Sequence, residues 1–237
     1  MKKRSRRYRN NAQRLNAEQR YEVVDALRVL KGVQGAKFNE TVEVAIRLGI
    51  DPKKSEQVVR GVAKLPHGTG NKVRVLVFAV GEKAQQARTA GADFVGGEEL
   101  IEQIKGGWLE FDSAVATPDM MQKVGAIAKI LGPRGLMPNP KIGTVTQDVA
   151  KAVEELKAGR VEFRVDKAAI VHAPVGKIAF SEEQLAENIS VLIDQVMKQK
   201  PATAKGQYFK GMAISSTMGP GLKIDATRIQ ATGGAKA

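Results

Sequence analysis

The chain contains no cysteine and only two histidines, His67 and His172, among its 237 residues. Disulfides, thiol nucleophiles and Cys-ligated zinc or iron–sulfur sites are therefore excluded, and so is a histidine-rich metal cluster. The longest stretch without Asp, Glu, Lys or Arg covers 12 residues, 211–222, and is rich in Gly and Ser. Because a membrane-spanning helix needs about 20 apolar residues, none is expected.

Acidic and aromatic residues are also scarce. There are 25 Asp and Glu against 38 Lys and Arg, a formal net charge of +13, and aromatic residues make up 5% of the chain. Such a charge points to a polyanionic partner. The few aromatics, unpaired on any expected strand, argue against base stacking on single strands. Contacts of shape, phosphate and 2′-OH with a folded RNA are therefore the expected mode of binding.

The excess charge is concentrated at the two ends of the sequence. Residues 1–67 carry a net +9, residues 161–237 carry +3, and residues 68–160 between them carry +1. This distribution is what a basic domain built from both ends, with a neutral insertion, would produce. The first nine residues, MKKRSRRYR, hold six basic residues and no acid. No apolar stretch follows them, so a secretory signal is not expected.

Three interpretations of this basic start remain open. It could be a solvated tail, an organelle transit peptide, or an arm that neutralises phosphates and orders on binding. We favour the arm because of the overall charge.

Hydrophobic patterning differs between the ends and the middle. At the ends we expect a helix over 18–30, an alternating strand over 41–48, paired strands at 160–165 and 169–173, and a last strand over 207–216. A capping box of Ser181 and Gln184 opens a helix over 181–200. In the middle, expected strands at 73–80, 91–95 and 112–116 alternate with expected helices at 82–90, 98–105, 118–131 and 145–158, the last with Thr146 as a possible cap.

These patterns predict the fold class. The ends, 1–67 and 160–237, are expected to form a discontinuous α+β two-layer domain. The middle, 68–159, is expected to be an inserted three-layer α/β domain of Rossmann-like type, because strands that alternate with helices indicate a parallel sheet.

Motifs for nucleotide binding or catalysis are missing. Only Gly81 follows the strand at 73–80, so the dinucleotide fingerprint G-x-G-x-x-G is not formed, and no P-loop occurs. No nucleophile elbow is present, and paired carboxylates such as Glu98-Glu99 are typical of solvated helix starts. We therefore expect no enzyme activity, no cofactor and no small-molecule substrate. Two rival hypotheses remain, an α/β enzyme with a nucleotide site and a nonspecific basic nucleoid-type protein.

Three segments have compositions that suit a partner's backbone. The loop 131–141, LGPRGLMPNPK, combines three Pro with two Gly, and it predicts either a rigid connection or a shaped surface. Small hydroxyl residues and glycines at 215–221, including Ser216, would allow close approach of a ribose or phosphate. Lys37 and Phe38 place a cation beside an aromatic ring, and Phe38 could equally belong to the core.

Several segments together resemble one family. They are AKFNETVEVAIRLGID, LPHGTG, GADFVGG, LGPRGLMPNPKIGTV, AGRVEFRVDK, VHAPVGK and STMGPG, spread from Ala36 to Gly221. On these segments the chain resembles the family of large ribosomal subunit protein one, found in the mobile stalk beside the tRNA exit site. The resemblance implies a first domain made of both chain ends and an inserted second domain.

The resemblance also implies a function and a set of RNA-binding residues. The expected partners are the stalk of large-subunit rRNA, exit-site tRNA and the protein's own mRNA, whose translation it would repress. The expected location is the cytoplasm, in the large ribosomal subunit, with no membrane partner. The expected RNA-binding residues are Lys37, Phe38, Thr41, Asp166, Lys167, Ser216, Thr217, Met218 and Gly219.

Overall fold

The computed structural model describes residues 5–13, 15–16, 19–33 and 35–225. The chain divides into two compact units, one drawn from residues 1–70 and 161–237 and the other from residues 71–160. We refer to them as the terminal unit and the middle unit. Each has its own hydrophobic core, and both mix helices with β-sheet. No helix in the described ranges is long and apolar enough to cross a membrane.

The terminal unit contains most of the strands. Its elements are α1 (Arg6–Gln13), β1 (Arg20–Tyr21), α2 (Val23–Gly32), β2 (Thr41–Leu48), η1 (Ser55–Gln57), β3 (Arg60–Lys64), β7 (Arg160–Arg164), β8 (Ile170–Lys177), α8 (Glu182–Lys198), β9 (Phe209–Ser216) and β10 (Leu222–Ile224).

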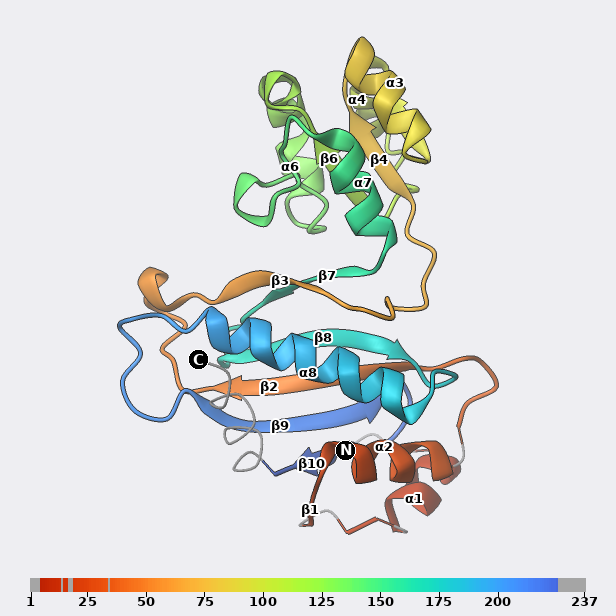
Figure 1. The fold of residues 1–237 in the computed structure, drawn as a ribbon, viewed down its shortest axis with the longest axis vertical. Coiled ribbons are helices and arrows are strands. Elements are labelled where there is room, and N and C mark those ends of the chain that lie inside the picture. The colour runs from red at the N-terminus through yellow and green to blue at the C-terminus, as the bar shows by residue number, and fades with distance from the viewer. Residues whose placement is uncertain (1–4, 14, 17–18, 34, 226–237) are drawn as a thin grey trace. The chain divides into compact units, whose positions relative to one another are not determined.

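A five-stranded sheet with the order β1-β10-β9-β2-β8 forms the base of this unit. Alternate residues of β2, namely Val42, Val44, Ile46 and Leu48, are buried, as the alternating sequence predicts. They face the layer formed by α2 and α8, which pack against each other and against the sheet (Figure 1). The predicted capping box of α8 is confirmed: Ser181 Oγ accepts from the Gln184 N–H, and the Gln184 side chain accepts from the Ser181 N–H.

The first segment that leaves the terminal unit, at His67 and Gly68, is hydrogen-bonded to one buried side chain of α8. Asn188 has 0% exposure, and its Nδ2 donates to Gly68 O at 3.0 Å and to Val175 O at 2.8 Å. Its Oδ1 accepts from the His67 N–H at 3.2 Å, while His67 Nε2 lies 2.6 Å from Glu187 Oε2. His67 is thus a hydrogen-bonding residue that links this loop to α8.

The middle unit is built around three parallel strands. Its elements are β4 (Val75–Phe78), α3 (Glu82–Thr89), β5 (Phe94–Gly96), α4 (Glu98–Lys105), β6 (Ser113–Ala116), η2 (Pro118–Met120), α5 (Met121–Val124), η3 (Gly125–Ile127), α6 (Ala128–Leu131), η4 (Pro140–Ile142) and α7 (Val149–Lys157).

The three strands run in the order β5-β4-β6, and all pairs are parallel. Leu76 and Phe78 on one face of β4 share a core with α4, α5 and α6. Val75 and Val77 on the other face share a core with α3 and α7. Every residue of β4 is buried, which explains the nearly continuous apolar sequence of this strand.

The structure corrects several predicted helices. The expected helix over 118–131 is broken into η2, α5, η3 and α6, because Gly125 weakens helix formation in its middle. The expected helix over 145–158 begins only at Val149, and its cap is Asp148 rather than Thr146, since Asp148 Oδ1 accepts from the Lys151 N–H. The expected helix over 18–30 begins at Val23, because residues 20–21 form β1 instead.

The pairing predicted for 160–165 with 169–173 is wrong except for one bridge between Val165 and Val171. β7 pairs with β3 and β8 pairs with β2, in different sheets. β3 and β10 were not predicted, since β3 lacks a run of β-branched residues and β10 has three residues. Part of the basic start forms α1, and residues 1–4 lie outside the described residues.

Candidate nucleic-acid interface

The start of β2 and the end of β9 meet at one end of the terminal unit. Val42 pairs with Ser216 in the antiparallel register. Beyond this pair the Thr217 N–H donates to Thr41 O at 3.0 Å, and the Thr41 N–H donates to Thr217 Oγ1, also at 3.0 Å. Lys177 at the end of β8 donates from Nζ to Thr41 Oγ1 at 2.9 Å. Two segments far apart in the sequence are thereby joined into one surface.

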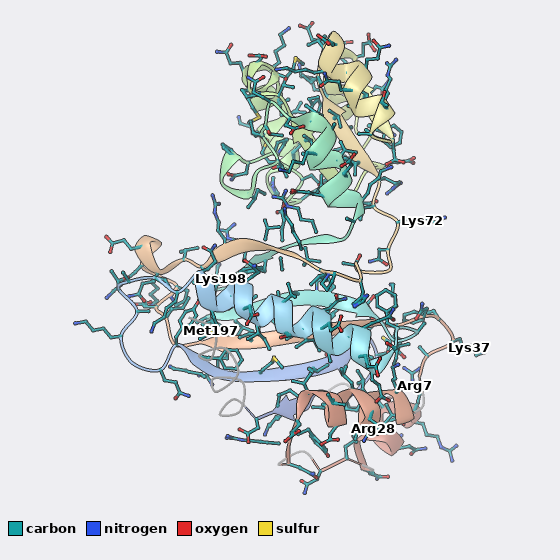
Figure 2. The ribbon with its side chains drawn as sticks, in the orientation of Figure 1. Arg7, Arg28, Lys37, Lys72, Met197 and Lys198 are labelled. Atoms are coloured by element: carbon teal, nitrogen blue, oxygen red, sulfur yellow. The ribbon has the colours of Figure 1, made fainter. Side chains whose placement is uncertain are left out.

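Large apolar side chains stand exposed on both sides of this junction. Phe38 is 55% exposed and Met218 is 53% exposed, so the alternative of a core position for Phe38 is wrong. Lys37 is exposed beside Phe38 and lies at one end of the terminal unit (Figure 2). The structure therefore brings together most of the predicted RNA-binding residues. We call the following set the strand-end cluster: Lys37, Phe38, Thr41, Ser216, Thr217, Met218 and Gly219.

A buried carboxylate that the sequence analysis missed holds the two halves of this cluster together. Glu40 is 2% exposed, and its Oε2 accepts from Ser216 Oγ at 2.6 Å and from the Met218 N–H at 2.9 Å. Its Oε1 accepts from the Ala36 N–H. The position before a strand gives no sequence signal that separates such a residue from a solvated glutamate.

Two opposing effects set the charge state of Glu40. Burial raises the pKa of this carboxyl, but the hydrogen bonds from Ser216, Met218 and Ala36, with the nearby charge of Arg7, together hold its pKa below the ordinary glutamate value. Charge-assisted bonds to several donors favour the ionised form in this way. Glu40 is therefore an anion that fixes its donors, and α1, which carries Arg7, lies near enough for its charge to be felt.

Ser216 and Gly219 have positioning roles in this geometry. Ser216 is 5% exposed, and its hydroxyl is used by Glu40, so it supports the surface from beneath. A Cβ at Gly219 would lie 2.4 Å from Ser216 Oγ, a distance that atoms do not tolerate. The Gly219 N–H also donates to Ser216 O at 3.1 Å. Glycine is thus required here by close packing.

Asp166 and Lys167 lie away from the strand-end cluster. They precede β8, whose first residue, Ile170, is opposite Arg47 near the end of β2, whereas Thr41 is opposite Lys177. Six residues of strand separate Arg47 from Thr41, or about 20 Å. Asp166 Oδ1 accepts from the N–H groups of Ala168 and Ile170, at 2.8 Å each, and the bond from Ile170 is the main cause that lowers its pKa.

Lysines gather at this second end of the terminal unit. The loop after β2, the end of α8, the loop that follows it and the start of β9 all reach it, and Gln57 Nε2 ties two of these loops together by donating to Thr203 O at 3.3 Å. Lys198 marks this end, opposite Lys37 (Figure 2). We call the following exposed residues the lysine end: Lys53, Lys54, Lys167, Lys198, Lys200, Lys205 and Lys210. Among the described residues, none of these lysines has an ion-pair partner within 4.0 Å.

Comparison with known proteins defines the class first. Residues 30–220 match the model of a family of ribosomal proteins, which is not a family of enzymes. The chain belongs to the ribosomal protein L1p/L10e family.

Two relatives agree with this assignment. The chain is 56% identical over 223 residues to the large ribosomal subunit protein uL1 of Cutibacterium acnes, which covers 94% of this chain and 96% of that protein. It is 55% identical over 224 residues to the protein of the same name from Beutenbergia cavernae, which covers 94% of each chain. The resemblance seen in the sequence segments is thereby confirmed.

Proposed function

We propose that the chain is a structural protein of the large ribosomal subunit, in the cytoplasm, that binds the stalk region of large-subunit rRNA through the strand-end cluster. The names of the two relatives support the location in the large subunit. The single observation that carries the binding site is the exposure of Phe38 and Met218 beside a rigid junction of Thr41 and Thr217. The function needs no cofactor and no catalytic step.

Docking by shape explains how this surface would choose its RNA. The cluster offers two paired strand ends, two exposed apolar side chains and the hydroxyl of Thr217, which can still accept a bond from a ribose 2′-OH. Glu40, bonded to Ser216 and to the Met218 backbone, keeps this arrangement in place before RNA arrives. Binding then orders few protein groups, and the small entropic cost favours affinity.

The lysine end is proposed to contact a second RNA segment, and exit-site tRNA is the partner we assign to it. Its support is the set of seven exposed lysines at the end opposite the strand-end cluster, for which the described part of the chain supplies no ion-pair partner. Point charges on long side chains suit a phosphate backbone without reading its sequence. A protein that holds rRNA at one end and tRNA at the other could assist the release of deacylated tRNA.

We further propose that the chain represses translation of its own mRNA. A messenger segment that imitates the rRNA site would occupy the strand-end cluster, because one rigid surface binds one RNA shape. Stalk rRNA and the messenger segment would then compete. A complex that holds both RNAs at that cluster would contradict this proposal.

The primary test compares two substitutions in the strand-end cluster, and one of them removes a hydroxyl. Thr217→Val keeps the shape of the side chain but removes its oxygen, and Met218→Ala removes an exposed apolar contact. Both variants are expected to weaken binding to stalk rRNA at least tenfold while binding to random RNA stays nearly constant. Thr89→Val on α3, also an exposed threonine, is the matched control. Equal losses on stalk and random RNA would show that the cluster is not the specific site.

A further inference from the structure

The middle unit is nearly neutral overall, but its basic and acidic residues are unevenly distributed along the sequence. Residues 120–147 contain four basic residues and no acid. The rest of the unit, within 71–160, holds eight basic and eleven acidic residues. One continuous segment of this unit is therefore cationic while the remainder is acidic, so only that segment is suited to approach a polyanion.

The cations of this segment differ in their surroundings. Lys123 is paired with Glu98. Lys129 on α6 and Arg134 in the following turn are exposed, and within the described residues neither has a carboxylate within 4.0 Å. We call residues 129–135 the acid-free tip. Its two free cations lie within six positions of each other in the sequence.

Backbone hydrogen bonds hold the turn of this tip in one shape. The Gly132 N–H donates to Ala128 O at 2.8 Å, the Gly135 N–H to Gly132 O at 3.1 Å, and the Leu136 N–H to Leu131 O at 3.1 Å. Gly135 has φ 71°, which glycine adopts without strain. The end of α6 and the tip are therefore fixed before any partner binds.

The base of the loop is fixed as well. The Asn139 N–H donates to Thr144 Oγ1 at 2.8 Å, and the Thr144 N–H donates to Asn139 O at 3.2 Å. Leu136 and Met137 pack against the core beneath α4, α5 and α6, and Pro138 is buried. Leu136, Met137 and Pro138 of the proline-rich segment thus point inward.

What remains outside is Gly132, Pro133, Arg134 and Gly135, together with Lys129. Protein partners are usually gripped by aromatic and apolar anchors, and this tip offers none apart from the proline ring. Charge and close backbone approach are what a phosphodiester strand recognises. We propose that the acid-free tip of the middle unit docks on an RNA backbone, as a contact separate from both ends of the terminal unit. The inference rests on the proposed function, since it requires an RNA-bound protein.

The absence of native cysteine allows a direct test. A cleavage reagent, iron-EDTA, is tethered to the full chain at Pro133→Cys, which leaves both cations of the tip in place, and the protein is bound to whole large-subunit rRNA. Asn39→Cys beside the strand-end cluster is the positive control, and Glu102→Cys on the exposed acidic side of α4 is the negative control. Hydroxyl radicals are expected to cut the RNA at discrete positions from 133 and from 39, but not from 102.

The outcomes separate this inference from the proposed function. Cleavage from 39 without cleavage from 133 would overturn the tip contact and leave the main site intact, and it is also the result expected if a protein covers the tip. Cleavage from neither would overturn the proposed function itself. In addition, Lys129→Gln with Arg134→Gln should make the slope of log affinity against log salt shallower by about 1.4–1.8, the equivalent of two phosphates. An unchanged slope would contradict the tip contact.

Discussion

Ser216 Oγ donates a hydrogen bond of 2.6 Å to Glu40 Oε2, although the two residues are 176 positions apart in the sequence. The bond joins the end of β9 to the residue that precedes β2, and Glu40 also accepts from the Met218 and Ala36 N–H groups. Because Glu40 is 2% exposed, neither of its carboxylate oxygens is accessible enough to contact RNA. Its contribution is to hold the exposed residues around it in a fixed arrangement.

Replacing Glu40 with Gln is expected to destabilise the terminal unit. An amide presents only one acceptor atom, and its NH2 group would face donors, so at least one buried N–H loses its partner. The expected loss is about 1–3 kcal/mol of unfolding free energy. Urea denaturation at pH 7 measures it. Glu43→Gln, an exposed neighbour on β2, should have little effect, and an equal loss there would contradict the role of Glu40.

Glu40 also gives the stability a predicted pH dependence. Because its pKa in the folded protein is lower than in the unfolded chain, the unfolded chain binds a proton first as the pH falls. Its contribution is therefore complete above the ordinary glutamate pKa and is lost as the pH falls below that value towards the folded pKa. The difference in unfolding free energy between wild type and Glu40→Gln should shrink on acidification below about pH 4.3. A constant difference would contradict this assignment.

Gly219→Ala is expected to damage the strand-end cluster, because the new Cβ would lie 2.4 Å from Ser216 Oγ and displace the hydroxyl from Glu40. Gly221→Ala, two residues on, is the matched control, since a Cβ there meets nothing within 4 Å. Binding to stalk rRNA should fall at least tenfold for Gly219→Ala and stay near wild type for Gly221→Ala. Similar affinities for the two variants would show that the close approach of Gly219 is unimportant.

The lysine end is expected to contribute through charge alone. Lys198→Gln with Lys205→Gln should weaken tRNA binding and make its salt slope shallower by about 1.4–1.8, because two phosphates are no longer neutralised. Lys105→Gln with Lys151→Gln in the middle unit removes the same charge from exposed helix positions. If the control pair changes the slope as much, the effect is one of net charge and the lysine end is not a site.

Asn188→Ala is expected to loosen the segment at His67 and Gly68 that leaves the terminal unit. It would leave the His67 N–H and the Gly68 and Val175 carbonyls without their partner, which costs about 2–4 kcal/mol of unfolding free energy. Glu187→Ala removes only an exposed contact to the His67 ring, with an expected cost under about 1 kcal/mol. Urea denaturation compares the two variants, and a smaller loss for Asn188→Ala than for Glu187→Ala would be the contrary result.

Local sequence patterns predict many of the helices and strands of this fold, but they do not predict which strands pair with each other. The alternation of β2 and the capping box at Ser181 are confirmed because neighbouring residues alone decide them. The partner of β7 was predicted wrongly, since alternation specifies which face is buried but not which strand lies alongside. Gly125 interrupts a helical pattern that is otherwise continuous, and tertiary packing decides how such a segment bends.

The candidate site, too, could be predicted only in part from the sequence. Phe38, Thr41, Thr217 and Met218 could be named from the segments that resemble the family, and the structure places them together. Glu40 could not be named, because its role depends on donors from β9 that only the folded chain supplies. The resemblance assigns Lys167 to the same site, but its place just before β8 puts it at the opposite end of the sheet. Proximity across a sheet depends on register, which the sequence does not state.

In the proposed function, the strand-end cluster selects one structure in large-subunit rRNA. The decisive experiment is chemical footprinting of the full chain on whole large-subunit rRNA, with wild type and Thr217→Val compared side by side. We expect one compact protected region within the stalk for wild type, and loss of that protection for Thr217→Val at the same protein concentration. Scattered weak protection, or a compact footprint that Thr217→Val leaves unchanged, would contradict it.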